Sequence, residues 1–209
     1  MEVLERGGSR LHFLGAVRGP VGEGERVRRE ILELRPDAVA VSLGREETMA
    51  LEAWDGTPGT PANPEEEVYA REMARFGEVR KPPPCFVEAL RAAGEIGAPC
   101  VPVDLDDGAF TDAYTRHVGT IEMMRYGRFV ERVLTRQPFK AGTPQSFALE
   151  FDGLLTRTKG YRRLEATRET HMAVALRAVL VKYRRAVAVV EIERAGGVLE
   201  RLRGDGPPS

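Results

Sequence analysis

Short apolar runs alternate with charged stretches of helical periodicity along this chain, and that alternation is typical of an α/β fold. The apolar runs are bounded by glycine, proline or acidic residues, as buried strands usually are. We expect strands at 11–14, 38–43, 100–103 and 186–190, and an edge hairpin that pairs Val3-Leu4 with the first of them across Gly7-Gly8-Ser9. Helices between single strands predict a central mixed, mainly parallel sheet flanked by helices.

Helical periodicity fills the segments between these strands. Asn63-Pro64 followed by three glutamates has the composition of a helix cap and an acidic first turn. Pro102 cannot donate to a ladder, so the strand at 100–103 is expected to be irregular or near an edge. We expect helices at 25–34, 48–54, 64–76, from Pro82-Pro83-Pro84 to Gly97, and at 114–135, 147–155 and 164–183.

Length and composition limit the class of protein. The 209 residues suit one domain, 1–209, for which we expect a flexible loop at 55–64 and a loose tail at 203–209. The formal net charge of −1 provides no global attraction to nucleic acid or to an anionic membrane. No apolar stretch reaches membrane-spanning length, MEVLERGGSR lacks a signal-peptide core, and Cys85 and Cys100 form no CxxC pair. We expect a cytoplasmic protein with neither nucleic acid nor membrane as partner.

Two short motifs follow the first and the last of the core strands. They are Gly15-Ala16-Val17-Arg18 and Glu191-Ile192-Glu193-Arg194, and each places an arginine beyond a strand end. Open α/β sheets bind ligands at the carboxyl ends of their strands, so residues of these motifs are the first candidates for a site.

The order of motifs resembles the TraB/PrgY group of the TraB, Tiki, erythromycin-esterase and ChaN-like superfamily. The segments that carry the resemblance span nearly the whole chain and are RLHFLGAVRG, RREILELRPDAVAVSL, FVEALRAAGEIGAPCVPVDLDD and ATRETHMAVALRAVLVKYRRAVAVVEI. Members typically show a GxxH motif at the first strand end, an acidic residue after the second strand, an aspartate after the third, an ERDxxMA helix and a second GxxH. The resemblance implies a TraB/ChaN-like fold with these motifs in one crevice.

This chain departs from the pattern of the group at three positions. The corresponding positions here are Gly15 to Arg18, Ser42, Asp104, Thr167-Arg168-Glu169 with Met172-Ala173, and Glu191 to Arg194. Both histidines of the GxxH motifs are thus arginines, and the acidic residue is a serine. Arginine has no lone pair for a metal, so we expect no metal, no cofactor and no metal-dependent hydrolysis at this site.

The residues leave three possibilities open for the role of the arginines at this site. Arg18 pairs internally, for example with Glu193; or Arg18, Arg168 and Arg194 bind a small anion, helped by the glycine-rich loop at 15–24; or the arginines do not converge. Asp104, Asp106 and Asp107 have the ligand type for Mg²⁺, but acidic turns of this kind are usually solvated.

Three functions follow from these possibilities. The first is a catalytically degenerate binding or regulatory module, whose crevice holds a small anion or an internal ion-pair network. The second is a hydrolase that uses carboxylates, with Glu193, Glu191 or Asp104 as candidates, or a residual metal-dependent hydrolase of the Tiki type. The third is a homodimeric scaffold that buries Met123-Met124 beside Tyr126 and Phe129, together with Phe147 and Phe151; the alternative is that these two faces pack on each other within one chain.

Overall fold

The fold is a five-stranded mixed sheet with helices on both faces, seen in a computed structural model that describes residues 1–136 and 139–204. The strand order is β1-β2-β5-β3-β4; β1 is antiparallel to β2, and the other four strands are parallel. The strands are β1 (Glu2–Arg6), β2 (Ser9–Ala16), β3 (Ala38–Val41), β4 (Cys100–Pro102) and β5 (Arg185–Glu191). The predicted α/β class and mixed sheet are therefore confirmed.

Helices connect the strands, except within the β1–β2 hairpin, and one further helix follows β5. They are α1 (Val21–Leu34), α2 (Arg45–Glu52), α3 (Pro64–Met73), the 3-10 turn η1 (Ala74–Phe76), α4 (Pro84–Ile96), α5 (Asp107–His117), α6 (Thr120–Arg136), α7 (Pro144–Leu155), α8 (Lys159–Lys182) and α9 (Ile192–Arg203). None of the helices in the part of the chain that the structure describes is long and apolar enough to cross a membrane.

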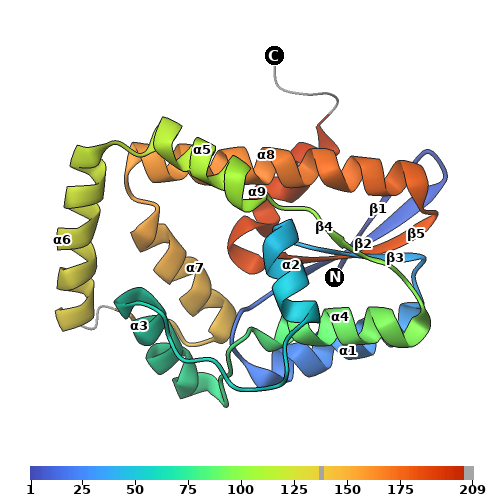
Figure 1. Ribbon diagram of the computed structural model, residues 1–209, viewed down its shortest axis with the longest axis horizontal. Helices are drawn as coiled ribbons and strands as arrows, with labels where there is room; N and C mark the ends of the chain where they lie inside the picture. The colour runs from blue at the N-terminus through green and yellow to red at the C-terminus, as the bar shows by residue number, and fades with distance from the viewer. Residues whose placement is uncertain (137–138, 205–209) are drawn as a thin grey trace.

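The two faces of the sheet have separate cores. In β5, Val187 and Val189 pack with α1 and α4, whereas Ala188 and Val190 pack with α8 and α9, as the two-residue period of a strand requires. Figure 1 shows the same layers, with α1 and α4 below the strands and α8 above them. The connections from β2 to β3 and from β3 to β4 run in one direction along the sheet, and the connection from β4 to β5 runs back. Right-handed crossovers therefore place α1 and α4 on one face and α8 on the other.

Local signals in the sequence set several element boundaries. Gly7 and Gly8 have positive φ angles and form the tight turn of the expected hairpin. The Asn63 side chain accepts a hydrogen bond from the Glu66 N–H at 2.9 Å and caps α3. Gly97 ends α4 with a left-handed φ of 71°. Pro102 lies in β4, which is an edge strand, as its missing N–H predicts.

The helix expected at 114–135 is two helices, which corrects the prediction. Val118 has extended backbone angles, φ −105° and ψ 104°, and its buried side chain packs with Ala113 and Leu164. Gly119 follows before α6 begins at Thr120. The chain turns here because Val118 enters the core between α5 and α8.

The C-terminal motif is also placed differently from the prediction. Glu191 is the last residue of β5, but Ile192, Glu193 and Arg194 form the first turn of α9, a helix that the periodicity analysis missed. Arg203, expected in a loose tail, is the last residue of this helix, and 205–209 lie outside the described residues. The segment 53–63 contains no helix or strand, in agreement with the expected loop, whose flexibility stays a prediction.

Helices α3 and α7 cover the carboxyl ends of β2 and β5. Their aromatic cluster packs against Val17 and Ile192, which follow those strand ends directly. Phe147 and Phe151 belong to this cluster and are 0% and 7% exposed, so they are not available for the dimer interface that we expected them to form. Met123 and Met124 on α6 are 47% and 55% exposed, and the Phe129 side chain lies outside the described residues.

Close packing of α1 on α4 provides a test of the fold. A Cβ built on Gly24 would lie 2.8 Å from the carbonyl oxygen of Pro84, so backbone would have to move. We predict that Gly24→Ala lowers the free energy of unfolding by about 1–3 kcal/mol in urea denaturation, although alanine favours helices.

Gly94 in α4 is the matched control for this substitution. It is exposed, and a Cβ there meets nothing within 4 Å. Gly94→Ala should therefore raise the free energy of unfolding by about 0.5–1 kcal/mol. Equal effects of the two substitutions would contradict the packing of α1 against α4.

Candidate functional site

The carboxyl ends of β2 and β5 form the switch point of the sheet. The two strands are adjacent and parallel, with Ala16 paired to Glu191, which brings the two motifs to the same edge. The chain leaves β2 towards α1 on one face and leaves β5 into α9 on the other. Open α/β sheets bind ligands in the crevice that such diverging connections create, so this edge is the candidate site.

Glu191 lies at the centre of this edge and is buried. Its two carboxylate oxygens face two arginines, Arg18 at 3.4 Å and Arg168 at 3.4 Å, and its backbone N–H donates to the Ser42 hydroxyl at 3.0 Å. Burial alone would raise the pKa of Glu191, but Arg18, Arg168 and Arg194 outweigh it and hold the pKa below its ordinary value. Glu191 is therefore an ionised, paired carboxylate rather than a free base.

Arg168 joins the ends of β4 and β5 from helix α8. Its guanidinium donates to the Asp104 carboxylate at 2.5 and 3.1 Å and to Glu165 at 2.9 Å, besides facing Glu191. Asp104 is 8% exposed and also accepts the Leu105 N–H at 2.8 Å. The Asp104 carboxylate is thus directed at an arginine, while Asp106 caps α5.

Arg194 is enclosed by carboxylates of α7 and α8. It pairs with Asp152, with Glu165 at 3.3 Å and with Glu169 at 3.3 Å, and only 6% of its side chain is exposed. Glu165 also pairs with Arg168, and Glu169 pairs with Arg201 at 2.8 Å. The ion pairs therefore form one continuous network from Arg18 to Arg201.

Glu193 is the least satisfied carboxyl group of this network. Its side chain is 4% exposed and lies 3.7 Å from Arg18, the internal pair that the sequence suggested. Its Oε2 atom is buried without a hydrogen-bond partner among the described residues. Burial raises the pKa of Glu193, and Arg18 only partly opposes this. Glu191 and Glu193 both face Arg18, and of the two carboxyl groups Glu193 is the one that retains its proton to higher pH.

Carboxylates outnumber arginines in the network. Its arginines are Arg18, Arg168, Arg194 and Arg201, and its acids are Asp104, Asp152, Glu165, Glu169, Glu191 and Glu193. Burial raises the pKa of Asp152 and of Glu169 as well, which reduces the excess of negative charge. An anion entering the interior of this network would meet carboxylates that already occupy the guanidinium groups.

Arg18 differs from the other arginines of the network because it reaches a cavity. Its side chain is 44% exposed, and its guanidinium makes no hydrogen bond to the described residues. The guanidinium lies 5.8 Å from the centre of the Tyr69 ring, and the Tyr69 hydroxyl donates to the Arg18 carbonyl at 3.2 Å. The cavity has a volume of about 430 Å³, and its apolar wall comes from Tyr69, Val79, Phe151 and Leu155.

All six sequence-predicted candidates lie in this network: Arg18, Asp104, Arg168, Glu191, Glu193 and Arg194. Asp152 of α7 and Glu165 of α8 were not among the sequence candidates, and Glu169 was named only as part of the motif around Arg168; Glu165 and Glu169 lie three residues before and one after Arg168. Their spacing of four on one helix was the available signal, since it places both on the same face. Within 1–136 and 139–204, no group of three or more histidine, cysteine, aspartate or glutamate side chains is arranged to hold a metal ion.

Comparison with known proteins adds no relative: no protein-family model matches the chain, and no curated protein matches it. Its function is therefore inferred from the geometry of the site.

The enclosure of Arg194 leads to a stability prediction. Arg194→Ala would leave Asp152 and its neighbours without their shared cation, so we predict a loss of about 3–5 kcal/mol of unfolding free energy at pH 7. Arg80, whose side chain is 61% exposed and pairs with Glu78, is the control, and Arg80→Ala should cost less than about 1 kcal/mol. Similar losses of unfolding free energy for Arg194→Ala and Arg80→Ala in urea denaturation would contradict a closed network.

The raised pKa of Glu193 predicts a pH dependence. As pH rises through the ordinary glutamate range, the unfolded chain releases the proton that native Glu193 retains, so stability falls. Glu193→Gln removes this contribution, and its stability relative to wild type should increase from about pH 4 to pH 7. Urea denaturation across this range tests it, with exposed Glu200→Gln on the same helix as the control. A relative stability that falls towards pH 7 would mean that Glu193 is ionised in the native protein.

Proposed function

We propose that this protein is a binding module for a small anionic ligand, not a hydrolase, and that the ligand occupies the cavity beside Arg18. The observation that carries the proposal is the contrast among the arginines. Arg168 and Arg194 are enclosed by carboxylates, whereas Arg18 presents an exposed guanidinium to a cavity at the switch point of the sheet.

The cavity wall favours a ligand that carries both an anionic group and a ring or other apolar part. Guanidinium N–H groups bind carboxylates and phosphates in pairs. Arg80 and Lys81 also line the cavity, together with the acids Glu65 and Glu66, of which Glu66 pairs with Lys81. Tyr69, Phe151 and Leu155 provide an apolar surface opposite these charges. Ligand sites typically combine such a surface with a few polar groups that fix orientation.

The family and the setting remain proposals. We propose that the chain is a TraB-like member of the TraB/ChaN-like superfamily in which both GxxH positions hold arginine. Arg18 and Arg194 in ion pairs support the degenerate form of the site rather than a metal-dependent one. Both cysteines are free thiols, which supports a cytoplasmic location. A homodimer, if formed, would use Met123 and Met124 without Phe147 and Phe151.

Carboxylate hydrolysis is the second candidate, because the Oε2 atom of Glu193 is buried and unpartnered. A buried carboxyl with a raised pKa is a candidate general acid or base. Glu193 lies behind Arg18, however, and does not line the cavity. Turnover of 4-nitrophenyl phosphate or 4-nitrophenyl acetate that Glu193→Gln abolishes would favour hydrolysis over binding.

Phenyl phosphate is a suitable probe because it combines a phosphate with an aromatic ring. We predict that it binds the wild-type protein in calorimetric titration, and that Arg18→Gln weakens binding by about 10- to 100-fold through loss of charged hydrogen bonds. Arg18→Lys keeps the charge but loses the paired donors, so its affinity for phenyl phosphate should lie between those of the wild type and Arg18→Gln.

Benzyl alcohol controls for damage to the apolar wall. Its affinity should be the same in the wild type and in Arg18→Gln if the cavity keeps its shape. Equal binding of phenyl phosphate by wild type and Arg18→Gln would exclude Arg18 as the anion ligand.

A further inference from the structure

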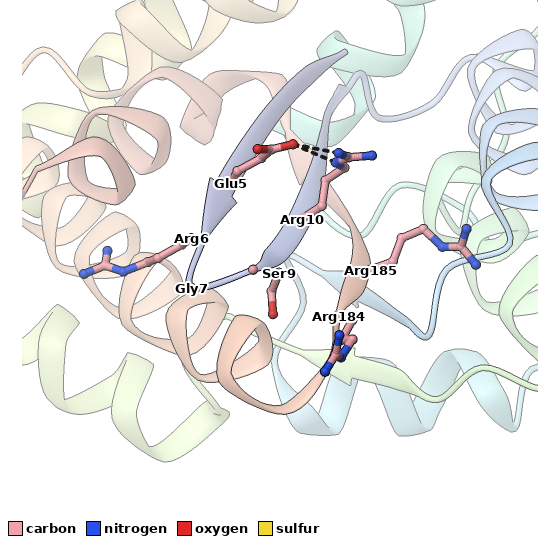
Figure 2. A pocket seen from close by; sticks show the side chains of 8 residues that line it. Glu5, Arg6, Gly7, Ser9, Arg10, Arg184 and Arg185 are labelled. Atoms are coloured by element: carbon pink, nitrogen blue, oxygen red, sulfur yellow. Dashed lines mark hydrogen bonds and ion pairs between the residues drawn. The ribbon is translucent and has the colours of Figure 1, made fainter.

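A second pocket lies at the opposite, amino-terminal edge of the sheet and is lined mainly by arginine. It has a volume of about 410 Å³ and is formed by the β1–β2 hairpin and the start of β5. Figure 2 shows its charged side chains, Arg6, Arg10, Arg184 and Arg185, with Glu5. This composition is the reverse of the acid-rich network at the carboxyl edge.

Most of the positive charge in this pocket lacks an internal partner. Arg10 donates two hydrogen bonds to Glu5, at 3.0 and 2.7 Å, and so neutralises the one acid in the lining. Arg6, Arg184 and Arg185 are exposed, and none of them has an ion pair with a carboxylate of the described residues. Asp37 accepts a hydrogen bond from the backbone N–H of Arg185, not from its guanidinium.

The arginines straddle the edge of the sheet rather than converging on one point. Arg10 and Arg185 are register partners in β2 and β5 and therefore share a face, whereas Arg6, opposite Ser9, belongs to the other face. In Figure 2 the guanidinium groups of Arg6 and Arg185 extend in opposite directions, and Arg184 extends in a third. Groups that extend in different directions from the two faces of the sheet favour an anion with several linked phosphates over a single orthophosphate.

The hairpin turn leaves room for such an anion. Gly7 and Gly8 lie between Arg6 and Ser9, and a Cβ at either would meet nothing within 4 Å. The lining includes no aromatic ring on which a nucleobase could stack. Because the whole chain has a net charge of −1, a long polyanion extending beyond this edge would gain no further net attraction.

We propose that this edge binds a compact polyphosphorylated anion, one with several phosphate groups within the span of the hairpin and the start of β5, through Arg6, Arg184 and Arg185. Adjacent phosphates occur in inorganic polyphosphate, in nucleoside triphosphates and in polyphosphorylated cyclitols, and these sources share the chemistry that the arginines recognise. The site is independent of the cavity beside Arg18.

Calorimetric titration of the full chain with inorganic tripolyphosphate tests this proposal. Tripolyphosphate should bind about ten times more tightly than orthophosphate, or more. Its affinity should fall as the salt concentration rises from about 50 to 200 mM, because exposed charges are screened over this range. The double variant Arg184→Gln/Arg185→Gln should lower tripolyphosphate affinity by about ten-fold or more.

Two controls separate this site from other charges. Arg29→Gln/Arg163→Gln makes the same change in net charge at exposed positions of α1 and α8 and should leave affinity within about two-fold of wild type. Arg18→Gln should have no effect, and a loss there would place tripolyphosphate in the other cavity. A ten-fold loss in both double variants, or in neither, would overturn the proposal.

Comparison of anions identifies the source of the phosphates. Inositol hexakisphosphate or ATP binding more tightly than tripolyphosphate, with the same dependence on Arg184 and Arg185, would support the site and name its preferred class. A twelve-nucleotide oligothymidylate that binds more tightly than all three would overturn the proposal, because the site would then recognise nucleic acid.

Discussion

The buried carboxylate of Glu191 is the constraint on which the arrangement of this edge depends. Removing a carboxylate from water costs several kcal/mol unless cations and donors replace its hydration. Arg18 beyond β2 and Arg168 on α8 supply the cations, and Ser42 beyond β3 accepts the Glu191 N–H. Arg168 in turn holds Asp104 beyond β4. One residue at the end of β5, through its carboxylate and its backbone N–H, thus ties together the ends of the four parallel strands and the long helix above them.

The two edges of the sheet have opposite electrostatic character although the net charge of the chain is close to zero. At the carboxyl edge an excess of acids surrounds the arginines of the network, and of these arginines in the described part of the chain Arg18 is the one that lines a cavity. At the amino edge the pocket lining contains one glutamate and four arginines, and three of these arginines have no carboxylate partner in the described part of the chain. Affinity for anions is therefore a property of two local surfaces. A global charge count could not reveal it, since the opposite charges cancel in the sum.

Local sequence determined most of the elements and indicated six residues of the ion-pair network. Hydrophobic period gave the core strands, while Asn63, Gly97 and Pro102 marked a helix start, a helix end and an edge strand, because each acts on backbone groups close to it. Candidates taken from separate strand ends lie in one network because parallel strands bring their carboxyl ends to the same edge. The same reasoning missed α9, where apolar residues at helical spacing, Ala195, Val198, Leu199 and Leu202, surround two glycines.

What only the tertiary structure decided is which charges face each other and which face solvent. Arg18 and Arg194 occupy equivalent positions in two similar motifs, yet one opens on a cavity and the other is enclosed by acids of α7 and α8. The turn at Val118, which sends α6 away from α5, was likewise set by a core contact with Leu164. Residue type fixes what a side chain can bind, but its partners come from segments remote in sequence, and burial by those segments determines its charge state and its access to a ligand.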